Sequence, residues 1–233
     1  MRFYHPTKQN VKMQVIDLPN FGIIEAQLTE EHVDLLYKDL IRQAPEGWEF
    51  DGHKIVKGTE VPQWDFDWSP ETYEKFMGEC LGPCINTYAE KYGKHTLMCT
   101  SQMHGISVSR CWVRCSKPGE YLSVHDHSAL WSFAVWLNIP YDYREEQKDN
   151  EAFTPYAGDF QLIYPSTTGI MLKKNWRLDR AMEGRMIFFP SQISHMVYPH
   201  HTTSGAAFDG EYRVCVAGNI SLDSYQVLDN VAS

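Results

Sequence analysis

The segment Ile106-Ser-Val-Ser-Arg-Cys-Trp-Val-Arg-Cys115 alternates between two sets of side chains along its whole length. Arg110, Trp112 and Arg114 belong to one set, and Val113 belongs to the other with the cysteines. A period of two is typical of a β-strand, because successive side chains of a strand point to opposite faces. The chain is therefore expected to form β-structure from about residue 104 onward.

Further strand candidates follow this segment, and turn residues such as Lys117-Pro-Gly119 separate them. Many short strands with turn signals between them predict an all-β sandwich or barrel. The expected strands cover residues 121–127, 131–139, 158–164, 170–172, 185–189, 196–198 and 212–220.

The residues before this region predict helices. Thr29 can cap a helix whose first turn carries Glu30 and Glu31, and Ser69-Pro70 can begin a second one, which Gly82-Pro83 should kink or break. We expect a single domain over residues 1–233. A mixed α/β support region (1–103) would pack against a β core (104–222), and a C-terminal tail (223–233) would follow.

Composition narrows the classes of function. The 233 residues are 43% hydrophobic and carry a net charge of −9, with scattered basic residues. Nucleic-acid or anionic-membrane binding is therefore not expected, because it needs clustered positive charge. The sequence shows no membrane-spanning run and no signal-peptide core, so we expect a cytoplasmic protein with its six cysteines reduced and packed.

Three histidines form a candidate metal site. On a strand, His125 and His127 would share one face while Asp126 points the other way. His195 follows another expected strand and could supply a third ligand, leaving open coordination positions. The alternative is that these are ordinary polar side chains. His200 and His201, in a loop rich in Thr, Ser and Gly, are interpreted as solvated.

Several of these motifs together resemble the 2-oxoglutarate/Fe(II)-dependent oxygenase superfamily, most of all its uncharacterised members from bacteria and their phages. The resemblance covers about residues 105–222. It is carried by Val124-His-Asp-His127, Leu130-Trp-Ser-Phe-Ala-Val-Trp-Leu137, Gly184-x3-Phe-Phe-Pro-Ser191, His195-x-Val197-x-Pro199 and Tyr212-Arg213-Val-x-Val216-x-Gly218-Asn219.

The resemblance implies a mainly β protein with flanking α, a double-stranded β-helix (a jelly roll, cupin-like) whose barrel the N-terminal helices buttress. It implies that His125, His127 and His195 hold Fe(II), and that Arg213 binds the far carboxylate of 2-oxoglutarate. A guanidinium suits that role because it grips a carboxylate with two parallel hydrogen bonds. Trp136 and Ser132 fall on pocket positions of the family, and strand alternation adds Asn219.

Two features depart from the superfamily pattern. His127 stands where the superfamily usually has a carboxylate, so Asp126 is an alternative ligand if the strand is bulged. His195 and Arg213 are eighteen residues apart, about twice the usual spacing. The additional loop, residues 199–211, is either a lid over the site or a tolerated surface loop.

The resemblance implies a dioxygenase that uses 2-oxoglutarate and O2 as co-substrates, yields succinate and hydroxylates a C–H bond. One alternative is a cupin-type three-histidine dioxygenase that does not use 2-oxoglutarate. Another is a non-catalytic jelly-roll binding protein. The substrate is expected to be a small molecule or a peptide. A homodimer stays open, and the location would be the host cytoplasm if the chain is phage-encoded.

Overall fold

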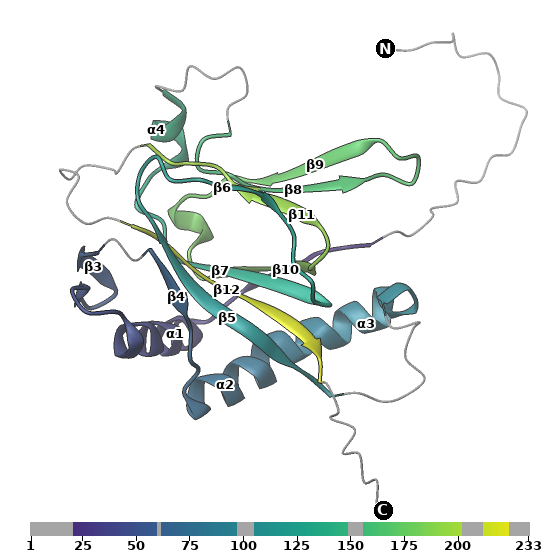
Figure 1. Cartoon of the computed structure of the whole chain (residues 1–233), viewed down its shortest axis with the longest axis horizontal. Coiled ribbons are helices and arrows are strands. Elements are labelled where there is room, and N and C mark those ends of the chain that lie inside the picture. Colours follow the sequence, from purple (N-terminus) through teal and green to yellow (C-terminus); the bar gives the residue numbers. More distant parts are fainter. Residues whose placement is uncertain (1–20, 60–61, 97–104, 149–155, 202–211, 224–233) are drawn as a thin grey trace, which may run out of the picture.

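Two antiparallel sheets form the body of the protein (Figure 1). The computed structural model describes residues 21–59, 62–96, 105–148, 156–201 and 212–223. The larger sheet has the strand order β1-β10-β7-β12-β5-β4. These strands are β1 (Ile24–Gln27), β10 (Arg185–Pro190), β7 (Trp131–Asn138), β12 (Arg213–Leu222), β5 (Ile106–Ser116) and β4 (Gln63–Asp65).

The smaller sheet lies over one face of the larger one and has the order β6-β11-β8-β9. Its strands are β6 (Leu122–His125), β11 (Ser194–Val197), β8 (Phe160–Pro165) and β9 (Met171–Trp176). A separate ribbon pairs β2 (Glu49–Asp51) with β3 (Lys54–Lys57). The chain passes directly from β5 in the larger sheet to β6 in the smaller one, so residues of both sheets come together at that corner.

Three helices, α1, α2 and α3, cover the opposite face of the larger sheet (Figure 1). α1 (Glu30–Gln43) begins at Thr29, whose side chain accepts a hydrogen bond from the His32 backbone, as the sequence predicts. α2 (Pro70–Phe76) likewise begins at the predicted cap Ser69. The remaining helical elements are a π turn (Met77–Leu81), α3 (Gly82–Thr96), α4 (Tyr143–Lys148) and a 3₁₀ turn (Arg180–Met182).

Gly82-Pro83 does not end the helical path. The backbone N–H of Gly82 donates to the carbonyl of Met77, five residues earlier, and this bond closes the π turn between α2 and α3. Pro83 has no N–H to donate to the helix. The π turn contains one residue more than an α-helical turn, and this extra residue accommodates the missing hydrogen bond without breaking the helix.

Two hydrophobic cores lie on either side of the larger sheet. The outer core joins the helices to one face of the sheet and contains Phe133 and Val135 of β7. The inner core lies between the sheets and contains Ala134 and Trp136 of the same strand. This alternation follows from strand geometry, and it directs every second residue of β7, β5 and β12 into the space between the sheets.

Two predicted strand limits were wrong near the histidines. The strand expected over residues 121–127 ends at His125, so His127 lies in the segment that follows β6. His195 was expected before a strand at 196–198, but it lies within β11. The expected division between residues 103 and 104 falls outside the described ranges, and so does the expected tail 223–233 except for Asp223.

Within the described ranges, no helix combines the length and the apolar character that crossing a membrane requires.

Candidate metal centre

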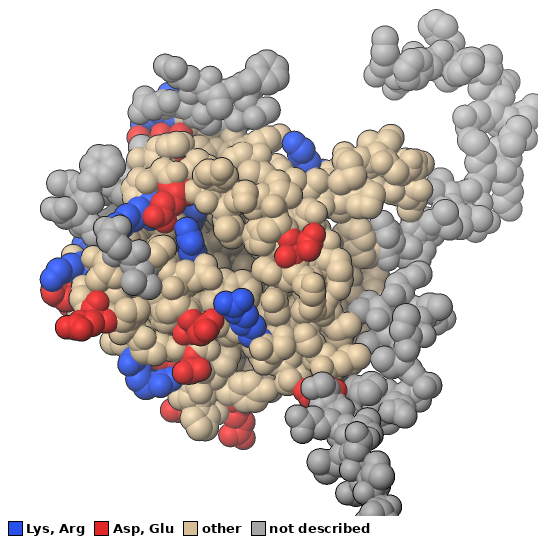
Figure 2. All heavy atoms as spheres, in the orientation of Figure 1, with Lys and Arg blue, Asp and Glu red and all other residues tan. Residues whose placement is uncertain are grey.

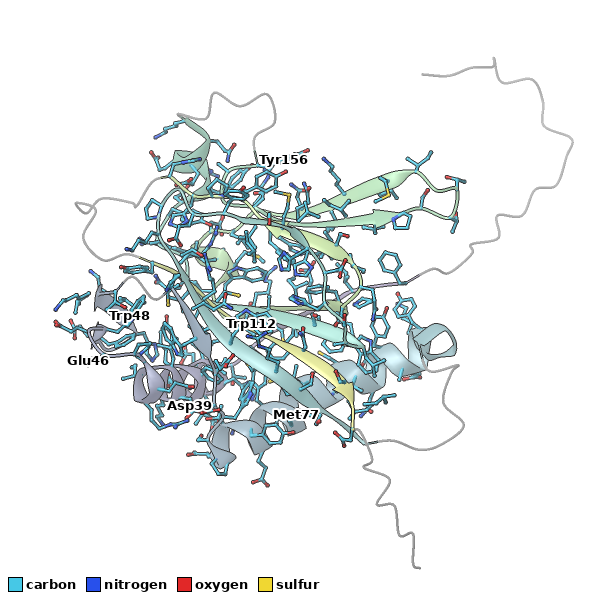
Figure 3. The ribbon with its side chains drawn as sticks, viewed as in Figure 1. Asp39, Glu46, Trp48, Met77, Trp112 and Tyr156 are labelled. Carbon is cyan, nitrogen blue, oxygen red and sulfur yellow. The ribbon has the colours of Figure 1, made fainter. Side chains whose placement is uncertain are left out.

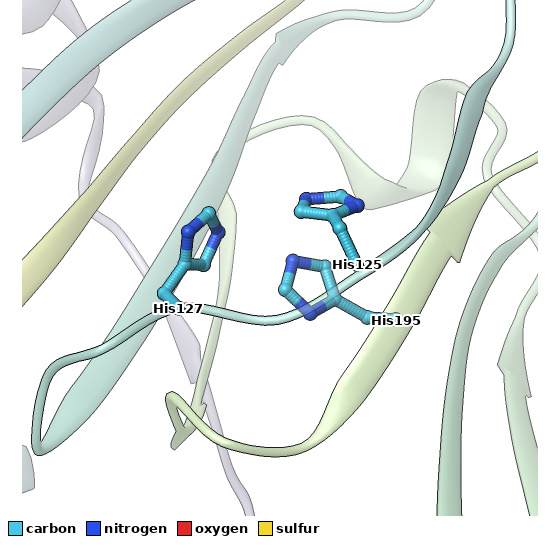
Figure 4. A group of neighbouring side chains, drawn as sticks. All are labelled: His125, His127 and His195. Atoms are coloured by element: carbon cyan, nitrogen blue, oxygen red, sulfur yellow. The ribbon is translucent and has the colours of Figure 1, made fainter.

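Three imidazole rings converge between the sheets, near the segment that leads from β6 to β7 (Figure 4). His125 comes from the end of β6, His195 from the neighbouring strand β11, and His127 from the segment after β6. The ring centroids of His125 and His195 are 4.1 Å apart, and His127 lies 5.1 Å from each of them. One nitrogen from each ring lies within 4.8 Å of the others, a spacing that a single metal ion can bridge.

A β-bulge places His125. His125 pairs with His195 and Leu122 pairs with Val197, so three steps along β6 match two steps along β11. The extra residue breaks the strict alternation, and Leu122 and His125 both line the cavity between the sheets. A bulge was expected only as a way to bring in Asp126. It lies before His125 instead, and Asp126 is exposed and outside the histidine group.

Local hydrogen bonds orient two of the rings. The Nδ1 of His125 lies 2.7 Å from the Ser123 carbonyl, and the Nδ1 of His195 lies 2.9 Å from the Ile193 carbonyl. A carbonyl can only accept, so each Nδ1 carries the proton and each Nε2 keeps a lone pair. Such backbone contacts fix the tautomer and direction of metal-binding histidines.

The backbone of His127 is held instead of its ring. Its N–H donates to the carbonyl of Ser191, 2.9 Å away, in the turn between β10 and β11. The ring packs against the indole of Trp112, with 5.4 Å between the centroids. The hydrogen bond to Ser191 therefore keeps His127 next to the other two histidines, although His127 lies outside β6.

Burial keeps two of the imidazoles neutral. Burial lowers the pKa of His195 to about 4, with a smaller contribution from the neighbouring His125 and His127. Burial, and then His125, also lowers the pKa of His127. Metal ions bind neutral imidazole, so a lowered pKa reduces the competition from protons.

Arg213 faces the same cavity. Its side chain is buried at the start of β12, and its Nη1 donates to the Tyr141 hydroxyl at 3.1 Å and to the carbonyls of Tyr198 and Gly158 at 3.1 and 3.4 Å. All three of these acceptors of Arg213 hydrogen bonds are neutral oxygens, and none of its acceptors among the described residues is a carboxylate. A buried guanidinium without a counter-ion suits an anionic ligand.

The other predicted pocket residues divide into two groups. Trp136 and Ser132 line the cavity. Asn219 does not line it and lies behind Ser132, where its Oδ1 accepts a hydrogen bond from the serine hydroxyl at 2.9 Å. The same hydroxyl is 2.8 Å from Ser191, so this chain of contacts also supports the turn that holds His127.

The interpretation of His200 as a solvated residue was wrong. Its ring is fully buried and stacks on Tyr141 at 4.8 Å, and neither ring nitrogen has a hydrogen-bond partner among the described residues. Burial, followed by the nearby Arg213, lowers its pKa to about 2. His201 is exposed, as expected. The polar composition of the surrounding loop hid the burial of His200.

Three cavity residues were missed, and one pattern could have revealed them. Trp112, Arg114 and Ser116 all line the cavity from one face of β5. Their period-two spacing places them on the same side, opposite Cys115. Trp112 is only partly buried, whereas Trp131 and Trp176 are buried.

The donors present suit iron and an oxo-acid. Three neutral nitrogens leave coordination positions open for ligands that bind and react at a metal ion. The cavity that the histidines share also contains the Arg213 guanidinium, which can bind the remote end of a dicarboxylate.

Comparison with known protein families agrees with the resemblance inferred from the sequence motifs. Residues 110–219 match the sequence profile of a family described as "Putative 2OG-Fe(II) oxygenase". The search of curated proteins gave no match.

The comparison with solved structures found matches of low sequence identity, among them the following three. A truncated viral collagen prolyl hydroxylase from Paramecium bursaria Chlorella virus-1 is 14% identical, with 91% of this chain and 98% of that one covered and a TM-score of 0.51. A Pseudomonas putida prolyl-4-hydroxylase is 13% identical (88% and 94% covered, TM-score 0.48). The non-heme alpha ketoglutarate dependent epimerase SnoN from nogalamycin biosynthesis is 12% identical (91% and 87% covered, TM-score 0.47).

The two facing sheets with helices on one side are thus the predicted jelly roll, a fold shared with the viral enzyme. The strand-rich core of this chain, over residues 110–219, matches a 2OG-Fe(II) oxygenase family, and the resemblance inferred from its histidine and arginine motifs is confirmed.

Proposed function

We propose that this protein is an Fe(II)- and 2-oxoglutarate-dependent dioxygenase that hydroxylates a C–H bond of an organic substrate. His125, His127 and His195 hold the iron, and Arg213 binds the far carboxylate of 2-oxoglutarate. The observation that carries the proposal is the shared cavity, in which three converging imidazoles and a buried guanidinium face the same space.

The charges of the site support this co-substrate. Three neutral imidazoles leave the two positive charges of Fe(II) uncompensated, whereas a carboxylate ligand would cancel one of them. Arg213 adds another positive charge in a buried position. A dicarboxylate such as 2-oxoglutarate brings one negative charge to each region, because one end can chelate the metal and the other can pair with Arg213.

The chain's own residues orient the reactants and exclude water. The hydrogen bonds of Arg213 to Tyr141, Gly158 and Tyr198 fix the direction of its guanidinium before any ligand arrives. Trp136, Phe160 and Phe189 form apolar walls of the cavity. When bound, Fe(II) and 2-oxoglutarate supply dioxygen activation, in which the co-substrate becomes succinate and CO2 and one oxygen atom enters the substrate.

The test is an anaerobic titration of the metal-free protein with Fe(II) and then with 2-oxoglutarate, followed by visible absorption. The expected result is a charge-transfer band that appears only when both are present. Arg213→Gln should weaken 2-oxoglutarate binding about 10- to 100-fold, because it removes a charge-assisted hydrogen-bonded pair. His195→Ala should abolish iron binding, whereas His201→Ala, a change at an exposed histidine, should leave it intact.

Circular dichroism of each variant checks that the fold is kept. Iron binding without a spectral response to 2-oxoglutarate would contradict the co-substrate and favour a three-histidine dioxygenase of the cupin type. Absence of stoichiometric iron in the wild type would contradict the metal centre and favour a non-catalytic binding protein.

A further inference from the structure

One face of β5 forms a ladder of polar and aromatic side chains that leads into the cavity. Trp112, Arg114 and Ser116 lie on this face, and all three line the cavity. Ser116 pairs with Arg213 on the neighbouring strand β12, so it is the member of this row that lies nearest Arg213. Arg114, two residues earlier, pairs with Cys215 and with Gln63 of β4, which also lines the cavity.

Arg114 has an incomplete set of hydrogen bonds. Its Nε is buried and has no hydrogen-bond partner among the described residues. Its Nη2 lies 3.5 Å from Glu120, a carboxylate that is also 3.2 Å from the backbone N–H of Lys117. The arginine side chain is 26% exposed, so solvent and small molecules can reach it. A side-on pair of N–H groups, Nε and Nη2, is the part of a guanidinium that best fits a carboxylate.

Trp112 supplies a flat apolar surface beside this arginine. It lies between the sheets, and its indole contacts the ring of His127, so it borders the metal centre directly (Figure 3). The guanidinium carbon of Arg110 lies 5.7 Å from the centroid of the Trp112 indole, and its Nη2 forms an ion pair with Asp65 Oδ1 at 3.4 Å. Figure 2 shows a hollow in this face of the molecule, with basic side chains at its margin.

Two arginines line the cavity, and 2-oxoglutarate accounts for only one of them. Under the proposed function it provides one carboxylate for the metal and one for Arg213. Arg114 keeps only the Glu120 carboxylate, 3.5 Å from its Nη2, and its buried Nε has no hydrogen-bond partner among the described residues. The cation is therefore expected to contact something that the co-substrate does not supply.

We infer that Arg114 binds a carboxylate of the substrate, and that the substrate's organic body lies on Trp112 next to the iron. The substrate is thus an organic acid, with its reactive C–H bond within a few carbon atoms of the carboxylate. The inference rests on the proposed function for the chemistry, but binding of an acid to Arg114 is testable without turnover. Arg114 and Trp112 are specificity-determining residues in this scheme.

The experiment compares acids with their uncharged analogues. The twenty N-acetyl amino acids and their primary amides are offered to the Fe(II)-loaded protein with 2-oxoglutarate in air, and succinate release is followed. At least one acid is expected to raise succinate release above the rate without added compound, with its amide at least tenfold poorer in kcat/KM. Arg114→Gln should reduce kcat/KM for that acid about 10- to 100-fold and leave the amide unaffected, because one charge-assisted pair is lost.

The control is Arg185→Gln. This arginine is 38% exposed, pairs with Glu25 and does not line the cavity, so its loss should change the acid's kcat/KM less than twofold. The affinity of Arg114→Gln for 2-oxoglutarate, read from the charge-transfer band, should stay within twofold of the wild type. A larger loss would overturn the inference and assign Arg114 to the co-substrate.

Calorimetric titration of the metal-free protein with the same acids separates this inference from the proposed function. Binding that requires both the carboxylate and Arg114 supports the inference even if no charge-transfer band forms. Equal binding of acid and amide, binding of no acid, or binding of phenyl phosphate alone would each overturn it.

Discussion

The three imidazoles of the proposed iron site are held unequally. His125 and His195 each donate Nδ1–H to a carbonyl two residues earlier, whereas His127 is anchored through its backbone N–H to Ser191. Loss of a strand histidine therefore removes an oriented donor. Loss of the His127 ring removes a donor next to the partly exposed Trp112 and leaves space that a small molecule can enter.

We expect His127→Ala to bind Fe(II) more weakly than wild type, by at least tenfold, and to recover most of the affinity in millimolar imidazole. His195→Ala should not recover, because its site is buried among Phe160 and Phe189. Anaerobic Fe(II) titration with and without imidazole measures both effects. Equal rescue of the two variants would show that position 127 is not distinct.

His200 is a residue whose burial has a cost. A buried polar group without a hydrogen bond destabilises the folded state by about 1–3 kcal/mol. His200→Phe keeps an aromatic ring against Tyr141 and removes both unpaired nitrogens, so it should raise the free energy of unfolding by about 1 kcal/mol at pH 7. Urea unfolding measures the difference, and His201→Ala at the exposed neighbouring position serves as the control.

The gain from His200→Phe should be larger at pH 5. The pKa of His200 in the folded protein is about 2, well below the value of about 6.5 for an unfolded chain. The unfolded chain therefore binds a proton that the folded protein rejects, and wild-type stability from this group is lost as pH falls below about 6.5. A variant that shows the same loss between pH 7 and pH 5 as wild type would contradict this assignment.

At the scale of elements, the π turn between α2 and α3 depends on Gly82. A Cβ added at Gly82 would lie 2.7 Å from the Met77 carbonyl oxygen, the same atom that accepts the Gly82 N–H. Gly78, in the same turn, has no atom within 4 Å of an added Cβ. Gly82→Ala should therefore destabilise the protein by about 1–2 kcal/mol through backbone shift, whereas Gly78→Ala should stabilise it by up to about 1 kcal/mol through helix propensity.

Urea unfolding of the two glycine variants compares them in one background. Similar effects at both positions would mean that the π turn does not restrict the residue at its end.

The elements that the sequence predicts well are those whose signals are local. The alternation of β5 and the caps at Thr29 and Ser69 depend on neighbouring residues only, and the structure has all three. The bulge in β6 depends on the register with β11, seventy residues away, and the strand was expected to run two residues beyond its end at His125. The cross-strand contact of His127 with Ser191 has no local signal either.

At the scale of the whole molecule, the buried carboxylate of Asp159 makes stability depend on pH. Burial raises its pKa to about 6, although Asn175 donates a hydrogen bond to Oδ2. The folded protein then binds a proton more tightly than the unfolded chain between about pH 4 and pH 6. Stability from this group is therefore greatest at low pH and falls as pH rises through 6.

Asp159→Asn cannot ionise, so it should unfold a few degrees above wild type at pH 8 and lose this advantage at pH 4.5. Thermal unfolding at the two pH values measures the difference, with Asp51→Asn on the exposed surface of β2 as the control. A constant difference between variant and wild type at both pH values would contradict the role of Asp159.

The global fold and the set of histidines that meet could be predicted from sequence, because strand periodicity and a family resemblance both act over the whole core. The neighbourhood of Arg213 could not. Tyr141, Gly158, Tyr198 and His200 come from segments whose positions depend on how the two sheets close on each other, and no sequence pattern marks them. The cavity-lining face of β5 was partly predictable. The period-two spacing of Trp112, Arg114 and Ser116 predicts that they share one face of the strand, but it does not predict that this face lines a cavity.

The all-nitrogen donor set described for His125, His127 and His195 has a consequence for how the protein acquires its metal. Imidazole binds the later first-row ions well, and in the Irving–Williams order Ni(II), Cu(II) and Zn(II) each outcompete Fe(II) at such ligands. Among the described residues, no anionic side chain joins the three histidines to shift that order. Iron occupancy of the proposed site then depends on which metal ions are available. Protein made in a zinc-rich, iron-poor medium should therefore carry zinc and be inactive until the zinc is exchanged for iron.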